Sequence, residues 1–417
     1  MKGKLFDKSG CIRTTGNKPE QRVLFTGDLC PVFRLEKLLR GGKPEEAFGD
    51  TLQVFRSADV NIINLEAPLC KSRNALEKLG PNFRCDPSIA RTLAEAPVHI
   101  ACLANNHVMD QGEDGFFETL ETLRNAGILH SGTHSTGKED SPFLEYPSAG
   151  RNLAIINQGI AEGAISRQGP GPERLEPLAI RRSVENARLK GNMPFAVIHA
   201  GKEQVLFPSP GMKKLCRDLI DSGAAAVVCH HPHVPQGIEI YKNRPIAYSL
   251  GNFLFDWHTP EPETDCSFLL ELGISGKEVS EIRIHPFASG KDGCVALLKG
   301  KERESFIGLI NDLSSPLYNA EHHEKLWNEQ CRALLDSYYG PRMGRMGLFE
   351  SGTPEEKLKA ALTFLNLMEL QEHGEILRDG LLLRIGGTTG TEDTACKALL
   401  DELMQRLKSI SRSGNTR

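Results

Sequence analysis

The sequence has no long hydrophobic run and no long block of basic residues. Its start, MKGKLFDKSGCIRTTGNKPEQ, has no apolar stretch of the kind that a signal peptide needs, and no segment approaches the length of a transmembrane span. The formal net charge is only −4 at pH 7, which gives no indication of a nucleic-acid or membrane-surface partner. We therefore expect a soluble, cytoplasmic protein with no membrane span and no nucleic-acid partner.

Paired cysteine motifs are also absent. The chain has eleven cysteines, an odd number, and no CxxC pair occurs among them. Several of them, such as Cys102, Cys229 and Cys266, stand in apolar surroundings. This usage is typical of reduced thiols in a cytosol, and it argues against a disulfide framework and against a cysteine-rich zinc site.

The sequence does contain a series of short apolar runs that alternate with helical patterns. Strand-like runs at 22–26, 59–65, 98–104, 152–158, 195–199 and 225–229 each stop at polar residues. Residues 266–298 alternate apolar and polar side chains more regularly, as antiparallel strands with one wetter face do. The order predicts an α/β sandwich in which ligands collect beyond the carboxyl ends of the strands.

The ends of these runs carry carboxylates, amides and imidazoles. Each residue alone is explained as a turn or as a helix cap. Together they are the oxygen and nitrogen ligands that divalent metals prefer. The set consists of Asp28, Glu66, Asn106, His107, His199, His231 and His233.

Residues 225–256 are the densest part of this pattern. The run AAAVVC has the length of a buried strand and ends in His230, His231, Pro232 and His233. Three imidazoles in four residues are hard to use for packing and favour a metal site, because imidazole is the commonest metal ligand near neutral pH. The alternative is a solvated loop in which the histidines are incidental.

Five blocks of the sequence resemble the ordered motifs of CapA-type proteins, which are named for capsule and poly-γ-glutamate synthesis. The blocks are FTGDL, NIINLEAPL, LANNHVMDQG, HAGKE and HHPHVPQGIEIYKNRPIAYSLGNFLFD, and the resemblance covers residues 22 to 290. It implies a calcineurin-like metallophosphoesterase fold, in which mixed β-sheets are flanked by helices, followed here by a C-terminal helical extension. It also implies a hydrolase in which a metal-activated water attacks a phosphoester, amide or ester bond.

The resemblance implies roles for the residues at the strand ends. It implies one or two divalent ions, with manganese, zinc or iron as candidates. Asp28 and His233 would bind the first ion, Asn106, His199 and His231 the second, and Glu66 would bridge the two. His107 would protonate the leaving group or stabilise charge in the transition state, and Asp110 would orient that imidazole.

The sequence departs from the phosphoesterase pattern at two positions. Phosphoesterases usually begin with Asp-x-His, but Cys30 stands where the histidine is expected. Cys30 is either a thiolate ligand or a buried small apolar group. Glu66 stands where an aspartate is usual, which lengthens the reach by one methylene. The first ion would therefore have one ligand fewer than usual.

Three further residues keep two interpretations each. His230 is either a third imidazole ligand or a neighbour of the ligands. Glu203 either contacts the substrate or the metal ligands, or lies in a solvated turn. Asn252 either binds a ligand or holds the turn at Gly251.

The pattern also predicts how the chain is divided. We expect a polar arm at 1–20, a CapA-like domain at 21–300, a helical region at 301–410 and a disordered tail at 411–417. The helical region would be a lid, an oligomer face or a partner site, with His322 and His323 facing solvent. The expected substrate is an anionic small molecule or polymer. The second hypothesis is a non-catalytic component of polymer synthesis that holds a glutamate-rich chain through its metal pocket.

Overall fold

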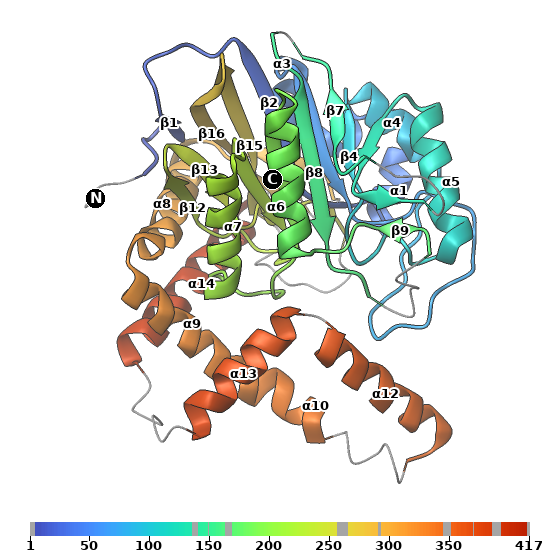
Figure 1. Cartoon of the computed structure of the whole chain (residues 1–417), viewed down its shortest axis with the longest axis vertical. Helices are drawn as coiled ribbons and strands as arrows, with labels where there is room; N and C mark the ends of the chain where they lie inside the picture. Colours follow the sequence, from blue (N-terminus) through green and yellow to red (C-terminus); the bar gives the residue numbers. More distant parts are fainter. Residues whose placement is uncertain are drawn as a thin grey trace.

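The computed structural model describes residues 5–135, 141–148, 150–162, 169–256, 266–290, 293–344, 352–369, 371–385 and 393–414 (Figure 1). Two β-sheets stack face to face, and helices cover their outer faces. A further group of helices lies below the sandwich in Figure 1.

The first sheet is mixed and runs in the order β1, β16, β15, β2, β3, β4, β5, with β14 also paired to β2 and β17 to β16. Strands β2 to β5 are parallel to one another and β14 is parallel to β2, whereas β15 pairs antiparallel with β2 and forms a long antiparallel hairpin with β16. The bounds are β1 (Cys11–Arg13), β2 (Gln21–Cys30), β3 (Val60–Leu65), β4 (Ile100–Cys102), β5 (Leu129–Ser131), β14 (Asn252–Phe255), β15 (Cys266–Ser275), β16 (Glu278–Ser289) and β17 (Val295–Leu297).

The second sheet runs in the order β12, β13, β11, β10, β8, β7. Its four inner strands are parallel, and the edge strands β12 and β7 are antiparallel to them. The bounds are β7 (Leu144–Tyr146), β8 (Leu153–Gly159), β10 (Met193–His199), β11 (Ala226–His230), β12 (Ile238–Tyr241) and β13 (Arg244–Ala247); a separate small ribbon pairs β6 (Thr133–His134) with β9 (Gly171–Pro172).

The space between the two sheets is filled by alternate apolar side chains from both, such as Phe25, Ile62, Phe195 and Val197. The other face of the first sheet is covered by short helices near the start of the chain and by α5, and the other face of the second sheet by α6 and α7 (Figure 1). The predicted fold class, an α/β sandwich of mixed sheets flanked by helices with a C-terminal helical extension, is confirmed. The helices of the sandwich are α1 (Phe33–Leu39), α2 (Glu45–Phe48), α3 (Leu52–Ser57), α4 (Ile89–Glu95), α5 (Gly112–Asn125), α6 (Pro177–Leu189) and α7 (Pro210–Ser222).

Helix α7 shows how local sequence sets these elements. Ser209 caps its N-terminus by accepting a hydrogen bond from the Met212 amide at 3.0 Å, and Pro210 occupies the first helical position. Gly223 ends the helix in a left-handed conformation, with φ of 115°. The strand β11 can therefore begin three residues later.

The helical C-terminal region divides between two places. Helices α8 (Gly300–Ser314) and α14 (Thr394–Gly414) pack on β15 and β16 and share the core between the sheets. Helices α9 (Ala320–Leu334), α10 (Gly340–Gly344), α12 (Pro354–Glu369) and α13 (Gln371–Ile385) form a separate layer, which we call the helical tier; it lies below the sandwich in Figure 1.

The ends of the chain differ from the predicted arm and tail. Within 1–20, strand β1 pairs with β16, and the Phe6 amide donates a hydrogen bond to Asn311 in α8 at 2.7 Å. Helix α14 continues through the predicted tail to Gly414, and residues 415–417 lie outside the described part. Part of the predicted arm and the first residue of the predicted tail, Ser411, are therefore packed against the sandwich.

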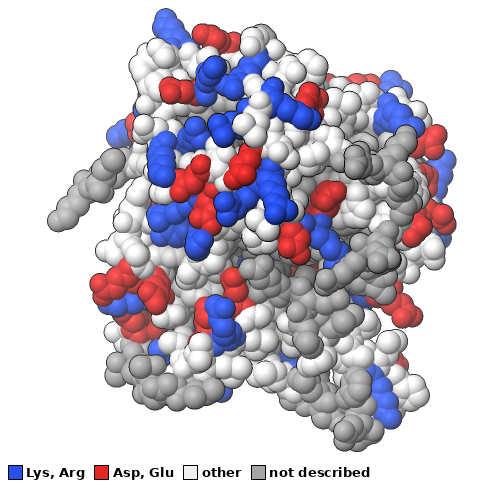
Figure 2. Space-filling view, viewed as in Figure 1, with Lys and Arg blue, Asp and Glu red and all other residues white. Residues whose placement is uncertain are grey.

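The charged side chains on the face shown in Figure 2 are mixed in sign. Lysines, arginines, aspartates and glutamates alternate over α6 and α7, without a broad field of one sign. Among the described helices, none combines the length and the apolar composition that crossing a bilayer requires.

Candidate metal centre

The carboxyl ends of strands from both sheets meet at one point. In the second sheet, His199 of β10 lies in register with His230 of β11, and in the first, Asp28 of β2 pairs with Asn64 of β3. Two glycines allow the close approach: a Cβ on Gly27 would lie 2.1 Å from the Gly251 carbonyl oxygen, and one on Gly159 2.0 Å from that of Ala104. The first sheet thus supplies oxygen atoms, and the second supplies imidazoles.

Glu66 lies at the centre of the cluster. Its side chain is fully buried, and neither carboxylate oxygen has a hydrogen-bond partner among the described residues. The Nε2 atoms of His199 and His233 stand 3.4 Å and 3.8 Å from Oε1. Burial, with the negative charge of Asp28 added to it, raises the pKa of Glu66 well above its usual value. A buried carboxylate without a donor calls for a cation.

Asp28 is the second buried carboxylate and, unlike Glu66, it accepts hydrogen bonds from neighbouring groups. It accepts hydrogen bonds from the Asn64 side chain at 2.8 Å and from the His231 amide at 3.2 Å. The Nδ1 atoms of His230 and His233 lie 3.1 Å and 3.3 Å from its oxygens. Burial raises the pKa of Asp28, but the contacts with these two imidazoles outweigh burial and lower the pKa well below its usual value.

The imidazoles are buried and held by amide side chains. His199 contacts the Asn106 oxygen through Nε2 at 2.9 Å and the Asn64 nitrogen through Nδ1 at 3.1 Å, and His233 contacts the Asn252 oxygen at 2.9 Å. Burial lowers the pKa of His231 to about 3 and that of His199 well below its usual value. For His233, burial is outweighed by the charges of Glu66 and Asp28, which raise its pKa to about 10.

The backbone of the imidazole loop is strained. His231 has φ of 96° and His233 has φ of 58°, values in the left-handed region that residues other than glycine rarely adopt. Each such residue costs on the order of 1–3 kcal/mol and persists where the surrounding structure imposes it. This backbone conformation places the imidazoles of His231 and His233, two residues apart, near the same carboxylate, that of Glu66.

The residues present fit divalent metal ions. Ligand atoms of Asp28, Glu66 and His199 lie within 4.8 Å of one another, and so do those of Glu66, His231 and His233. Both groups share Glu66, the residue predicted to bridge. They place His199 with Asp28 and His231 with His233, which differs from the division of ligands that the resemblance implies. Carboxylate, amide and imidazole groups are ligands that divalent metal ions prefer.

The remaining sequence candidates take different positions around this centre. His230 and Asn252 contact its members Asp28 and His233, and the metal-ligating groups named above include neither. Cys30 is fully buried in the apolar cluster under α1, and burial raises the pKa of its thiol well above the usual value. Glu203 is 45% exposed and forms an ion pair of 3.5 Å with Lys202.

His107 and Asp110 lie beside the centre as a pair. The Nδ1 atom of His107 is 2.7 Å from Asp110 Oδ2, and the same oxygen accepts a hydrogen bond from the Phe83 amide at 2.6 Å. The Phe83 ring packs on the imidazole at 4.4 Å between ring centres. Burial, with the charge of Lys78 added, lowers the pKa of His107 well below its usual value. Asn105 stabilises the turn that leads to His107, because its side-chain oxygen accepts hydrogen bonds from the His107 and Val108 amides.

Two residues of the centre were missed in the sequence. Lys78 is 1% exposed, forms an ion pair with Asp110, and lies 3.1 Å from His107 Nδ1 and 3.3 Å from the Asn106 carbonyl oxygen. Asn64 links Asp28 to His199. An asparagine inside the apolar run NIINL is a detectable signal, whereas Lys78 follows a polar passage in which nothing distinguishes it from a surface lysine.

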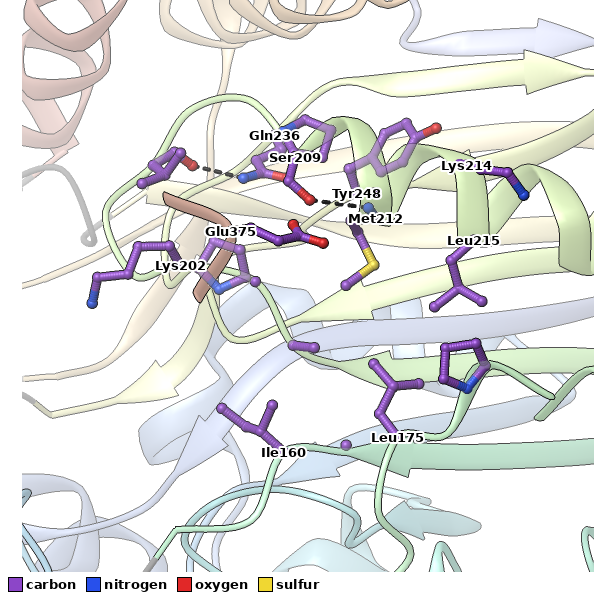
Figure 3. Close-up of a pocket in the computed structure, with 18 of the residues that line it drawn as sticks. Ile160, Leu175, Lys202, Ser209, Met212, Lys214, Leu215, Gln236, Tyr248 and Glu375 are labelled. Carbon is purple, nitrogen blue, oxygen red and sulfur yellow. Dashed lines mark hydrogen bonds between the residues drawn. The ribbon is translucent and has the colours of Figure 1, made fainter. Parts of the chain in front are cut away.

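A cavity of about 300 Å³ lies where the ends of β8 and β10 meet helices α6 and α7 (Figure 3). Its wall includes Ala200, Gly201 and Pro232, which directly follow His199 and His231. Ile160, Leu175, Met212, Leu215 and Tyr248 give it an apolar lining, and Glu375 of α13 reaches in from the helical tier (Figure 3). The tier therefore forms part of the wall of this cavity.

The chain is similar to several curated proteins. It is 27% identical over 244 residues to the capsule biosynthesis protein CapA of Bacillus anthracis, covering 56% of this chain and 59% of that protein. It is 26% identical over 269 residues to the PGA biosynthesis protein CapA of Bacillus subtilis (strain 168), covering 63% and 71%. It is 26% identical over 261 residues to a probable polyglutamine synthesis accessory protein of Mycobacterium tuberculosis, covering 58% and 69%.

Solved structures are more distant. A hypothetical protein from Thermus thermophilus aligns with a TM-score of 0.41 and 15% identity, over 64% of this chain and 99% of that one. The 5'-nucleotidase from Candida albicans aligns with a TM-score of 0.37 and 8% identity, over 73% and 56%.

The family model for the bacterial capsule synthesis protein PGA_cap matches residues 22–257. The match begins in β2, ahead of Asp28, and ends just beyond β14, so it contains every ligand candidate at the centre. It confirms the resemblance to CapA-type proteins, and the chain belongs to the bacterial capsule synthesis protein family PGA_cap.

Proposed function

We propose that this protein is a metal-dependent hydrolase that acts on an anionic substrate. The observation that carries the proposal is the position of Glu66, a buried carboxylate without a hydrogen-bond donor among the described residues, next to imidazoles and a second carboxylate. A purely structural site would pair such a group, because leaving it unpaired in the protein interior costs several kcal/mol.

The proposed ligands are those that surround Glu66. Glu66 would be shared by two ions, one held on the side of Asp28 and one on the side of His231. His230, Asn252 and Asn64 hold the ligands in place by the contacts described above. The set of ligands is Asp28, Glu66, Asn106, His199, His231 and His233.

A bound divalent ion would supply two effects here, a water whose pKa falls to about 7 and neutralisation of charge on the substrate. In its imidazolium form, which the adjacent Asp110 carboxylate stabilises, His107 would protonate the leaving group. Its Nδ1 side is taken by Asp110, so Nε2 is the atom left to exchange a proton with a substrate. Asp110, held by Lys78 and the Phe83 amide, fixes the orientation of the ring.

The substrate proposed is an anionic polymer or a fragment of one. The relatives are named for capsule, PGA and polyglutamine synthesis, and two metal ions beside a cavity would suit a chain of carboxylates or phosphates.

A non-catalytic role is the second candidate. One relative is named an accessory protein, and Cys30, which stands where phosphoesterases usually have a histidine, lies in an apolar cluster. In that role the centre would hold an anionic chain without cleaving it.

The experiment that separates these roles combines metal analysis with turnover. We expect purified protein to contain at least one ion of manganese, zinc or iron per chain and to hydrolyse a phosphodiester, a phosphomonoester or a γ-glutamyl amide. His107→Ala should keep the metal and lose turnover. Metal-dependent binding of poly-γ-glutamate without turnover of any of these compounds would support the second candidate, and protein with neither metal nor activity would refute both.

We also propose a cytoplasmic location. All eleven cysteines are free thiols, and the sulfur atoms of Cys216 and Cys229 lie 3.7 Å apart without a bond, as in a reducing compartment. Cell fractionation tests this placement, which recovery in the periplasm or in washed membranes would overturn.

A further inference from the structure

The helical tier is attached to the loop that follows the ligand candidate His199. The Gln330 side chain of α9 accepts hydrogen bonds from the Leu206 and Phe207 amides at 3.0 Å and 3.1 Å. Val205 packs into the apolar cluster of the tier, which includes Trp327 and Ile376. The loop is therefore fixed by residues that lie outside the part of the chain matched by the family.

The same loop places Lys202 against the aromatic ring of Tyr338, which lies between α9 and α10 of the tier. The Lys202 ammonium lies 4.4 Å from the centre of the Tyr338 ring, and the Arg342 guanidinium carbon lies 3.3 Å from it. His373 of α13 stacks on this ring, with 11° between the planes and 5.9 Å between the centres, and contacts the Tyr339 hydroxyl at 2.6 Å. Two cations are thus held against one ring whose orientation is fixed by an imidazole.

The charges of this group are not balanced. Lys202 is only 5% exposed, and its one hydrogen bond among the described residues is the 3.5 Å contact with Glu203, so two of its three donor hydrogens have no acceptor there. Arg342 donates to the Tyr338 carbonyl oxygen at 3.1 Å and has no acidic partner within the described part of the chain. Among the described residues, Glu203 is therefore the one acidic partner of Lys202, and Arg342 has none.

The group lies beside the metal centre. Lys202 and Glu203 follow His199 by three and four residues, and their charges act on His231, whose pKa is lowered chiefly by burial. Figure 3 shows the Lys202 side chain directed away from the centre of the cavity, whereas Glu375 points into it. Lys202 thus lines the cavity through part of its side chain, while its ammonium lies against the Tyr338 ring.

We propose that Lys202, Arg342 and Tyr338 form a binding subsite for an oxyanion group, a carboxylate or a phosphate, on the part of the substrate that extends beyond the metal centre. This inference rests on the proposed function for the identity of the substrate. The guanidinium would bind two oxygens of one anion side by side, and the ammonium would bind the same or a neighbouring anion. Specificity for a polyanionic chain would then come from the helical tier.

The test measures binding rather than turnover. A fluorescent oligoglutamate and a fluorescent polyphosphate of similar length are titrated with full-length protein in manganese buffer, and oligoglutamine serves as the uncharged probe. We expect Arg342→Gln and Arg342→Ala to weaken binding of one anionic probe by about tenfold or more, the loss expected for a hydrogen bond to a charged group. Arg342→Lys should recover part of it. The preferred probe tells which oxyanion the subsite takes.

The control is Arg378→Ala in α13, an exposed arginine that pairs only with its neighbour Asp379 among the described residues; it should leave binding unchanged. Thermal melting of each variant shows whether the chain is folded. Wild-type affinity in both folded Arg342→Gln and Arg342→Ala, equal binding of oligoglutamine, or no binding of either anion by wild type would overturn the subsite. Metal content and turnover of p-nitrophenyl phosphate by the wild-type protein test the proposed function separately.

Discussion

Buried histidines occur in two regions of this protein and have different surroundings in each. At the metal centre, His199, His231 and His233 face the carboxylates of Asp28 and Glu66. In the helical tier, His323 contacts the Pro208 carbonyl oxygen at 3.0 Å, and His373 contacts the Tyr339 hydroxyl. His323 was predicted to face solvent, which is wrong, since α9 turns it towards the sandwich; its neighbour His322 is not buried.

The comparison shows that burial by itself does not identify a metal ligand. An imidazole that forms a hydrogen bond with a neutral group is satisfied by that partner, and its role is structural. Imidazoles that converge on a carboxylate without donors leave a position that suits a cation. The predictions below concern one residue each: Glu66, Lys78, His323 and Cys30.

The largest effect is expected at Glu66. Glu66→Gln should lower turnover by about a thousandfold and remove at least one metal ion, because partners that merely support a ligand already contribute about 10–100-fold. Without metal the variant should be more stable than wild type by about 1 kcal/mol or more, since a buried charge has been removed. Metal analysis and urea unfolding measure both, with Glu185→Gln on the surface of α6 as the control. Unchanged metal content would show that Glu66 is not a ligand.

The next effect is expected at Lys78. Lys78→Met should lower stability by about 3–5 kcal/mol, because it leaves the Asp110 carboxylate buried without its cation. Turnover should fall by about 10–100-fold as His107 loses its fixed orientation. Urea unfolding and steady-state kinetics check the two effects. The matched control is Lys71→Met, an exposed lysine of the same loop; equal losses in both variants would count against a specific role for Lys78.

A smaller effect, dependent on pH, is expected at His323. Burial, with the charge of Lys213 added, lowers its pKa to about 4 in the folded protein, against about 6.5 when unfolded. Between these values the unfolded chain binds more protons, so stability present above pH 6.5 is lost as the pH falls towards 4, by about 2–3 kcal/mol.

His323→Gln should remove that part of the pH dependence, as measured by urea unfolding at a series of pH values. His322→Gln is the control on the same helix and should retain the dependence. Parallel curves for wild type and His323→Gln would contradict the assignment.

The smallest effect is expected at Cys30. Cys30→Ala should leave metal content and turnover unchanged and cost about 1 kcal/mol of stability, because the raised thiol pKa disfavours the thiolate that a metal would need. Loss of a metal ion in this variant would instead identify Cys30 as a ligand and as the replacement for the missing histidine.

Much of the sandwich could be predicted because its signals are local. Apolar runs of strand length, polar residues at their ends and helix caps such as Ser209 are readable in one dimension. The helical tier gave periodic patterns but no indication of its place, since packing against the loop at 204–207 depends on side chains more than a hundred residues away. Lys78 and the Tyr338 group escaped prediction for the same reason.

The sequence by itself determined the kinds of ligand and their order along the chain, because a strand's end and its last polar residue are fixed by local pattern. Only the tertiary structure decided that Glu66 is left without a donor among the described residues, that Lys78 supports Asp110, and that Lys202 and Arg342 share one ring. These relations depend on distances between residues far apart in the chain, which form only when the two sheets close and the helical tier packs on their edge.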